Sequence, residues 1–200
     1  MPKQPRRGRP RGYDTTDALE AATSVFWAKV YEGASVDALC RAMNMPRASL
    51  YKLFGDKQCL FFAAIDHYAR TRLAPLVQSL GPVGPLGQDL ESFFDHVVTL
   101  ARQDPSTPGY LISSVLSDAA GSSPLFKAEL DRRYAALEGH LSERLRHSAE
   151  NLGAPAEVLA VVMASVARGL TLRARSGVPA TELCAVGHAA ARDFLQPTGV

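Results

Sequence analysis

Residues 46–57 carry side chains whose types suit contact with a polyanion. Lysine and arginine pair with phosphate, hydroxyl groups bond to phosphate or base edges, and arginine can bond to guanine through two N–H groups. One such bidentate contact is worth about 1–3 kcal/mol of discrimination between bases. The apolar residues here define one side of a short helix and leave the other side toward solvent. The predicted inward residues are Leu50, Leu53 and Phe54, and the outward ones are Arg47, Ala48, Ser49, Tyr51 and Lys52.

A second short helix is predicted just before this one. Apolar residues recur over residues 36–43 at offsets of three, four and seven: Val36, Leu39, Cys40 and Met43. Asn44 follows where the chain must reverse, and asparagine tolerates a left-handed conformation. Pro46 suits the start of the next helix, and Ser35 at the cap of the first leaves backbone N–H groups for a phosphate. Two helices joined by so short a turn predict a helix-turn-helix, whose second helix enters the major groove of DNA.

The run around this motif, FWAKVYEGASVDALCRAMNMPRASLYKLFGDKQCLF, resembles the DNA-binding domain of the TetR/AcrR family of bacterial transcriptional regulators. The resemblance covers about residues 13–65. Val30 stands where the family usually has a glycine that ends the first helix, and Asn44 replaces the glycine of the turn. The matching positions are Phe26, Tyr31, Ser35, Val36, Leu39, Leu50, Tyr51, Phe54, Lys57, Leu60 and Phe61.

The resemblance implies roles for the outward residues of the motif. Arg47, Ala48, Ser49 and Lys52 become candidates for contact with base edges. Tyr51 and Lys57 become candidates for contact with phosphate. For Tyr51 the alternative is a buried hydroxyl that ties the two helices together.

The resemblance also implies a repressor that a small-molecule effector releases from a palindromic operator. Candidate lining residues of an effector pocket are Phe62, Phe93, His96, Tyr110, Ser113, Tyr134 and Arg168. Aromatic residues at helical spacing are more often core residues, so each candidate has a purely structural alternative. Arg168 lies in a strongly apolar helix and needs a partner if it is buried, either an internal carboxylate or an acidic ligand.

The last two predicted helices, at about residues 155–176 and 179–195, are candidates for self-association. The first is apolar around most of its circumference, which requires burial on most sides. Small residues allow close approach of backbones, and in the resembled family these helices pair across a two-fold axis. The alternative is that they only cover the core of one protomer. The predicted interface residues are Val158, Val162, Ser165, Gly169, Leu172, Leu183, Val186, Gly187, Ala190 and Phe194.

The basic charge of the chain is concentrated at its start. Residues 1–57 hold ten Lys and Arg against six Asp and Glu, whereas residues 58–200 hold twelve against fourteen, which places a polyanion partner at one end. Arg7, Arg9 and Arg11 lie in a Gly- and Pro-containing run that resembles an AT-hook, a segment that inserts into the minor groove. The alternative is a basic tail that contributes only counterion release. Either way, residues 1–12 are expected to be a disordered arm.

The remaining pattern predicts an all-α fold of eight or nine helices. A helix-turn-helix domain is expected at residues 13–56 and a helical effector-binding and dimerisation domain at residues 57–200. Pro75 is expected to stop a helix that begins near residue 57, and Gly153 to end a long helix that Ser123 caps. The other helices of the second domain are expected at about residues 88–103 and 110–120.

Composition and motifs weigh against several classes of protein. Cys40, Cys59 and Cys184 are odd in number and widely spaced, which indicates a reducing cytoplasm without disulfides or a zinc site. No apolar run approaches the eighteen residues of a membrane span, and no Gly-rich phosphate loop or nucleophile elbow is present, so no enzyme activity or cofactor is expected.

Two alternatives to a regulator stay open. One is an architectural DNA-binding protein without an effector. The other is a metal-dependent enzyme using His140, Glu143 and His147, which share a helix face, although a solvated polar face explains them more simply.

Overall fold

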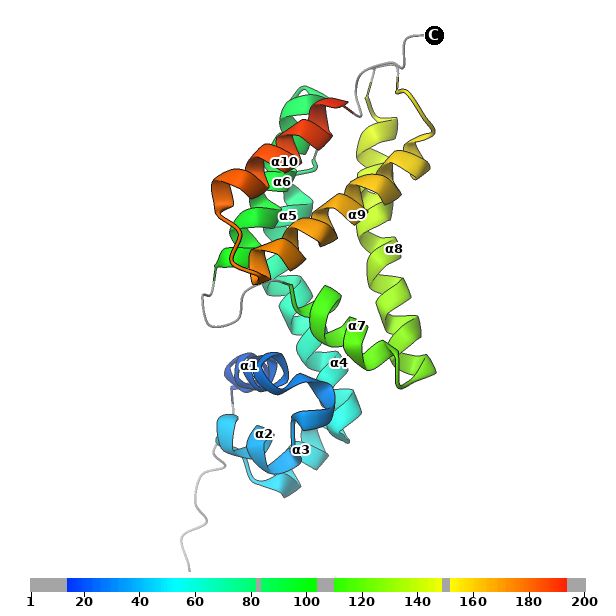
Figure 1. Ribbon diagram of the computed structural model, residues 1–200. Helices are drawn as coiled ribbons and strands as arrows, with labels where there is room; N and C mark the ends of the chain where they lie inside the picture. Colours follow the sequence, from blue (N-terminus) through cyan, green and yellow to red (C-terminus); the bar gives the residue numbers. More distant parts are fainter. Residues whose placement is uncertain (1–13, 82–83, 104–109, 149–151, 194–200) are drawn as a thin grey trace, which may run out of the picture.

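The computed structural model describes residues 14–81, 84–103, 110–148 and 152–193, and all regular structure in these ranges is helical. Three helices form a small lobe at the bottom of Figure 1: α1 (Thr15–Gly33), α2 (Val36–Ala42) and α3 (Arg47–Phe54). Asp14 caps α1 by accepting hydrogen bonds from the amides of Thr16 and Asp17. The prediction of an all-α fold is confirmed.

A continuous helical rod connects this lobe to the rest of the molecule. It consists of α4 (Lys57–Tyr68), the π-helical turn η1 (Ala69–Leu73) and α5 (Ala74–Gln78). The prediction that Pro75 stops the rod is wrong. Proline lacks an N–H group, and Pro75 falls in the first turn of α5, where that group would have no partner within α5. The rod therefore continues past Pro75 to Gln78.

The body lies above the lobe in Figure 1 and contains the remaining helical segments. The long α8 runs along one side, and α6, α9 and α10 pack together on the other. The prediction that α8 extends to Gly153 is wrong, because the helix ends at Arg146. Ser123 caps it and Pro124 begins it, as predicted. The segments are α6 (Leu86–Arg102), η2 (Ile112–Leu116, a π-helical turn), α7 (Ser117–Ala120), α8 (Pro124–Arg146), α9 (Ala156–Arg175) and α10 (Ala180–Asp193).

Two buried apolar clusters hold the molecule together. The first joins the lobe and α4 to η2, α7 and the start of α8, where Phe26, Phe61 and Phe126 lie within one aromatic group. The second fills the body between α5, α6, the end of α8, α9 and α10. Because the first cluster includes residues of both lobe and body, the lobe is packed against the body rather than tethered by a linker. Counting α4, η1 and α5 as one helix, and η2 with α7 as another, the described residues form nine helices, within the predicted number.

Candidate functional site

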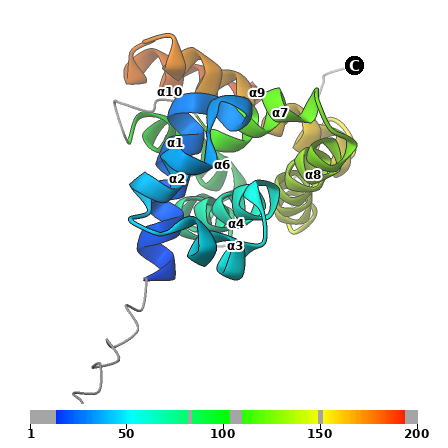
Figure 2. The same ribbon diagram turned by 90° about the horizontal axis from the view of Figure 1, so that it is seen from below.

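The outer side of α3 presents polar residues on the lower surface of the lobe. Figure 2 shows α2 and α3 side by side at this end of the molecule. Arg47, Ala48 and Lys52 are exposed, and Ser49 is half-buried. Tyr51 is 48% exposed, so its hydroxyl is not buried between the two helices. The predicted outward residues therefore share one accessible side of α3.

The inward side of α3 differs from the prediction at one residue. Leu50 is fully buried and Phe54 is partly buried, as predicted. Leu53 is 54% exposed, so its predicted inward orientation is wrong. Leu50 and Phe54, four residues apart, already fill the narrow contact of this two-turn helix with the lobe, and Leu53 falls beside that contact.

The turn between α2 and α3 has the geometry that the sequence predicts. Asn44 adopts φ 47°, in the left-handed region that asparagine tolerates. The amide of Met45 donates to the carbonyl of Cys40 at 2.9 Å, which closes the turn and buries Met45. The Ser35 hydroxyl accepts a hydrogen bond from the amide of Ala38 at 3.2 Å and caps α2. These local bonds fix the position of α3 relative to α2.

Arg47 is held by an acidic residue of α2. Its Nε and Nη2 atoms lie 2.8 Å and 2.7 Å from Oδ1 of Asp37, and both side chains are well exposed. The hydrogen bond to Asp37 raises the pKa of the Arg47 guanidinium above its ordinary value. Asp37 was not among the predicted site residues. Its spacing from Arg47 along the chain gives no sign of the contact, which depends on the angle between the two helices.

Lys57 lies at the start of α4, where the lobe meets the rod. Its ammonium group lies 4.3 Å from the centre of the Tyr31 ring and 3.4 Å from the carbonyl oxygen of Glu32. Asp56 caps α4 by accepting from the amide of Cys59 at 2.7 Å, which lowers the pKa of the Asp56 carboxyl. Lys57 is therefore half-buried and positioned by α1, next to the side of the lobe that carries α3.

The predicted effector residues do not all gather in one place. Tyr110 and Arg168 line a hollow in the body with about 300 Å³ of empty space, part of it open to solvent. The guanidinium of Arg168 lies 4.4 Å from the centre of the Tyr134 ring and 3.2 Å from Oε1 of Glu138. Of the two partners considered for Arg168, the structure therefore contains the internal carboxylate.

Of the other predicted effector residues, Ser113 contacts the lining of this hollow, and Phe62, Phe93 and His96 are not lining residues. The Ser113 hydroxyl lies 3.4 Å from that of Thr171, one of the lining residues. Phe93 is fully buried in the body cluster, Phe62 packs in the first cluster, and His96 is exposed. The lining residues that the sequence did not single out are Leu76, Val97, Leu100, Leu137, Ala167 and Thr171, whose spacing is that of ordinary core residues.

The predicted dimer residues divide between an outer surface and the interior of the protomer. Val158, Ser165 and Leu172 are exposed on α9, Val186 is exposed on α10, and Val162, Gly169 and Ala190 are half-buried. Leu183 and Gly187 are buried, and Gly187 packs against Phe94 of α6. Phe194, the last predicted interface residue, lies outside the described residues. So do Arg7, Arg9 and Arg11, which were predicted to contact DNA from the N-terminal arm.

The cysteines, possible metal ligands and helix lengths bear on the alternatives to a DNA-binding regulator. Burial raises the pKa of the Cys40 and Cys184 thiols, and for Cys184 a hydrogen bond with Asp95 adds to the effect; Cys59 is exposed. In the described ranges, no three His, Cys, Asp or Glu side chains form a group that could hold a metal ion. None of the helices in these ranges is long and apolar enough to cross a bilayer.

Comparisons with known proteins agree with this geometry. Residues 18–64 match the family described as bacterial regulatory proteins, tetR family. A solved structure of the TetR family transcriptional regulator CifR, a cysteine mutant complexed with 26-base-pair operator DNA, is 30% identical with a TM-score of 0.82. The match covers 93% of this chain and 100% of that one.

Two curated relatives match most of their own length and most of this chain. The HTH-type transcriptional repressor BdcR of Escherichia coli (strain K12) is 27% identical over 180 residues, which cover 89% of this chain and 87% of BdcR. The HTH-type transcriptional repressor AcnR of Corynebacterium efficiens is 28% identical over 166 residues, which cover 80% and 81%. The chain therefore belongs to the TetR family, as its sequence predicts, and is a DNA-binding transcriptional regulator.

Proposed function

We propose that the protein is a homodimeric repressor that binds a palindromic operator and is released by a small molecule. The observation that carries the proposal is the outer side of α3, where Arg47, Ala48 and Lys52 are exposed on a helix that the Asn44 turn fixes against α2. The 30% identity to a regulator complexed with operator DNA, over nearly the whole chain, supports the same role. Two repressors among the curated relatives favour repression over activation.

On this proposal, α3 lies in the major groove and Arg47 bonds to a base. Arg47 must then exchange its contact with Asp37 for a contact with DNA, at little cost because exposed ion pairs are weak. Ser49, Tyr51 and Lys52 flank it, while Ser35 and Lys57 lie where the ends of α2 and α4 approach phosphates. Arg7, Arg9 and Arg11 of the arm would add minor-groove contacts.

A dimer would form through the outer faces of α9 and α10. Exposed or half-buried residues, all apolar or small, follow one stripe of α9 at intervals of three and four, from Val158 through Val161, Ser165 and Gly169 to Leu172. No side chain of the described residues lies within 4 Å of a Cβ placed on Gly169, which leaves room for a second helix. Two-fold pairing of these helices gives each dimer two copies of α3, as a palindromic site requires.

An effector would occupy the hollow beside Arg168. Its lining is apolar apart from Arg168, Thr171 and the Tyr110 hydroxyl, which suits a small apolar molecule with one acceptor group. Leu76 of α5 lines the hollow, and the same rod begins at Lys57 in the lobe. A shift of the rod would therefore change the spacing of the two α3 helices. A hundredfold loss of operator affinity requires about 2.7 kcal/mol of coupling, within the ordinary range.

The test is binding to DNA from the protein's own upstream region, followed over a range of salt concentrations. We expect protection of a few operator-length sites and a steep salt dependence. Broad coating of A·T-rich DNA would support the architectural alternative instead, and absence of salt-sensitive binding to any duplex would refute the proposal.

The first prediction concerns Arg47. Arg47→Ala should lower operator affinity by about one to two orders of magnitude, because a bidentate base contact is lost, and should lower non-specific affinity much less. Arg70→Ala is the matched control, since Arg70 is exposed on η1, away from α3. Titration of operator and unrelated DNA with both variants measures the difference. Equal losses of both affinities in Arg47→Ala would contradict a role in reading bases.

A further inference from the structure

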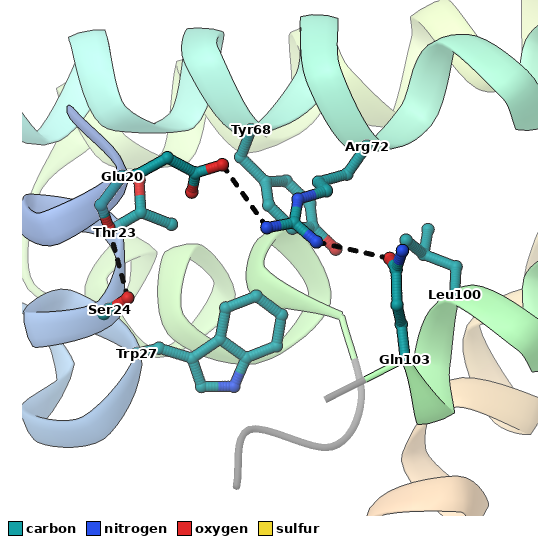
Figure 3. A pocket seen from close by; sticks show the side chains of 8 residues that line it. All are labelled: Glu20, Thr23, Ser24, Trp27, Tyr68, Arg72, Leu100 and Gln103. Atoms are coloured by element: carbon teal, nitrogen blue, oxygen red, sulfur yellow. Dashed lines mark hydrogen bonds and ion pairs between the residues drawn. The ribbon is translucent and has the colours of Figure 1, made fainter. Parts of the chain in front are cut away.

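A second hollow lies where the lobe meets the body, apart from the one beside Arg168. Figure 3 shows Glu20 and Trp27 of α1 on one side, Tyr68 and Arg72 of the rod above, and Leu100 of α6 with Gln103, which follows α6, opposite. It encloses about 470 Å³ of empty space, part of it open to solvent. Leu100 lines both hollows, and the rings of Tyr68 and Tyr110, 5.8 Å apart, lie between them.

The polar groups of this hollow are mainly hydrogen-bond donors. Arg72 brings a guanidinium, Trp27 an indole N–H and Tyr68 a hydroxyl, whereas the Gln103 amide presents its oxygen to Arg72. Among the described residues, Glu20 is the one carboxylate in the lining, and its Oε1 atom already lies 3.3 Å from Nη2 of Arg72. The second bond of Arg72, from Nη1 to Oε1 of Gln103, measures 3.4 Å. Both bonds are long, so a better acceptor can displace them.

Tyr68 contributes a buried hydroxyl for which the described residues provide no hydrogen-bond partner. The residue is 5% exposed, and no described group reaches the hydroxyl in hydrogen-bond geometry. Burial raises the pKa of Tyr68 well above its ordinary value, although the nearby backbone of Leu111 and the charge of Arg72 oppose the rise. A buried donor without an acceptor costs free energy, and an acceptor placed in the hollow would recover it.

The backbone at this point is irregular as well. Arg72 belongs to the π-helical turn η1, and such turns are frequent at functional sites. Trp27 packs edge to face on Tyr68, with ring centres 5.5 Å apart, and Leu100 adds an apolar wall. The hollow thus combines a flat apolar surface with the neighbouring donor groups of Arg72 and Tyr68.

We propose that this hollow binds a small organic carboxylate with a flat apolar body. The carboxylate would accept from Arg72 and Tyr68, and the body would lie against Trp27 and Leu100. Binding would replace the Glu20–Arg72 ion pair, which joins α1 of the lobe to the rod. The inference deepens the proposed function, because loss of that link would weaken operator binding.

The test uses Trp27, the only tryptophan of the chain, as a reporter within the hollow. The full-length protein is titrated with sodium benzoate at constant ionic strength while indole emission is followed on excitation at the red edge of its absorption band. Benzamide, which has the same ring but no charge, is the matched control ligand. We expect a saturable change with benzoate in the millimolar range and at least about tenfold weaker binding of benzamide.

Two variants locate the carboxylate. Arg72→Gln should weaken benzoate binding about tenfold or more, and Tyr68→Phe about threefold to tenfold. Tyr68→Phe removes only an unpartnered oxygen, so it should fold as stably as the parent protein. Arg70→Gln is the control, because Arg70 shares η1 but does not line the hollow. Absence of a saturable change, equal binding of benzamide, or unaltered binding in both variants would overturn the proposal. Loss of the response in Arg168→Gln with retention in Arg72→Gln would place benzoate in the other hollow and also overturn it.

A second measurement addresses regulation. Saturating benzoate should lower operator affinity several-fold in the parent protein and not in Arg72→Gln. A Trp27 response without any change in operator affinity would overturn the regulatory half of the proposal. If the protein bound no operator at all, the proposed function would fail, while the Trp27 response would still decide whether the hollow binds a carboxylate.

Discussion

Val30 is a residue at which the backbone is strained. It adopts φ 51° and ψ 178°, a region that is essentially restricted to glycine, and it interrupts the helical geometry of α1. The next residue, Tyr31, packs on Phe126 at 4.6 Å between ring centres and lies under the ammonium group of Lys57. The strained residue therefore immediately precedes the contact that joins α1 to the start of α4 and of α8.

The second prediction follows from this strain. Val30→Gly should raise the free energy of unfolding by about 1 kcal/mol, because relief of strain exceeds the entropic cost of glycine, and Val30 is 37% exposed and loses little burial. Lys29→Gly, in the preceding exposed turn of α1, should lower it by about 1 kcal/mol. Urea unfolding of both variants measures the difference, and similar destabilisation by both would contradict a strained Val30.

The third prediction concerns Asp37, the partner of Arg47. Asp37→Asn should raise affinity for unrelated DNA several-fold, because it removes a negative charge from the surface that faces phosphate and frees Arg47. Affinity for the operator should rise by at least as much, because Arg47 no longer has to leave Asp37 before it contacts a base. Binding titrations with both DNAs at two salt concentrations measure both effects. Unchanged non-specific affinity would show that Asp37 does not restrain Arg47.

At the scale of elements, local signals in the sequence predict helices well and their ends less well. Ser35 and Ser123 act through their own hydroxyl groups, and Asn44 and Pro46 through their own backbone. Their caps and turn are therefore where the sequence places them. Pro75 is different. Its effect depends on whether the chain before it makes an α-turn or a π-turn, and that depends on packing at η1.

The candidate functional sites also divide into those that local sequence predicts and those that depend on tertiary packing. The outer side of α3 was predictable because its inward and outward residues alternate with the helical period within the motif itself. The hollow at Trp27 and Arg72 was not, because its residues come from α1, α4, η1 and the end of α6, which only the tertiary fold brings together. Gly187 was expected at a surface between subunits, but α6 lies against it inside the protomer.

The fourth prediction tests this packing of α10 on α6. A Cβ added at Gly187 would lie 2.6 Å from Cβ of Phe94, whose ring is fully buried and cannot move aside. Gly187→Ala should therefore lower the free energy of unfolding by about 1–3 kcal/mol.

The matched control for this prediction is Gly139→Ala. In α8, Gly139 has no neighbour among the described residues within 4 Å of an added Cβ, and alanine should stabilise the helix by about 0.5–1 kcal/mol. Calorimetry at equal protein concentrations compares the two variants. A neutral Gly187→Ala would mean that α10 stands further from α6 than the structure places it.

At the scale of the whole molecule, the polar surface of α3 and the exposed apolar residues of α9 and α10 lie at opposite ends. The outer side of α3 lies at the bottom of Figure 1, whereas α9 and α10 lie in the body above it. The proposed pairing through α9 and α10 would leave both α3 helices free to bind DNA. The rod from Lys57 to Gln78 and the two hollows lie between these ends. A molecule bound in either hollow would therefore contact the rod and could change the position of α3 relative to α9 and α10.

The fifth prediction tests the dimer itself. Glutamate at two exposed positions of the α9 stripe, Val158→Glu with Leu172→Glu, should yield folded monomers, because two pairs of buried carboxylates would face each other across the two-fold axis. Leu125→Glu is the matched control, since Leu125 is 61% exposed on α8, outside the stripe. Sedimentation measures the mass, and circular dichroism checks that the fold is kept.

Operator affinity should fall with the dimer. Two linked α3 helices bind two half-sites with a high effective concentration of the second, so separate monomers should bind the operator about a hundredfold or more weakly. Their affinity for a single half-site should change little, because each α3 remains intact. A double variant that stays dimeric would place the interface elsewhere than on α9. A monomer that retained full operator affinity would show that one α3 helix suffices, and that the two-fold arrangement contributes nothing to recognition.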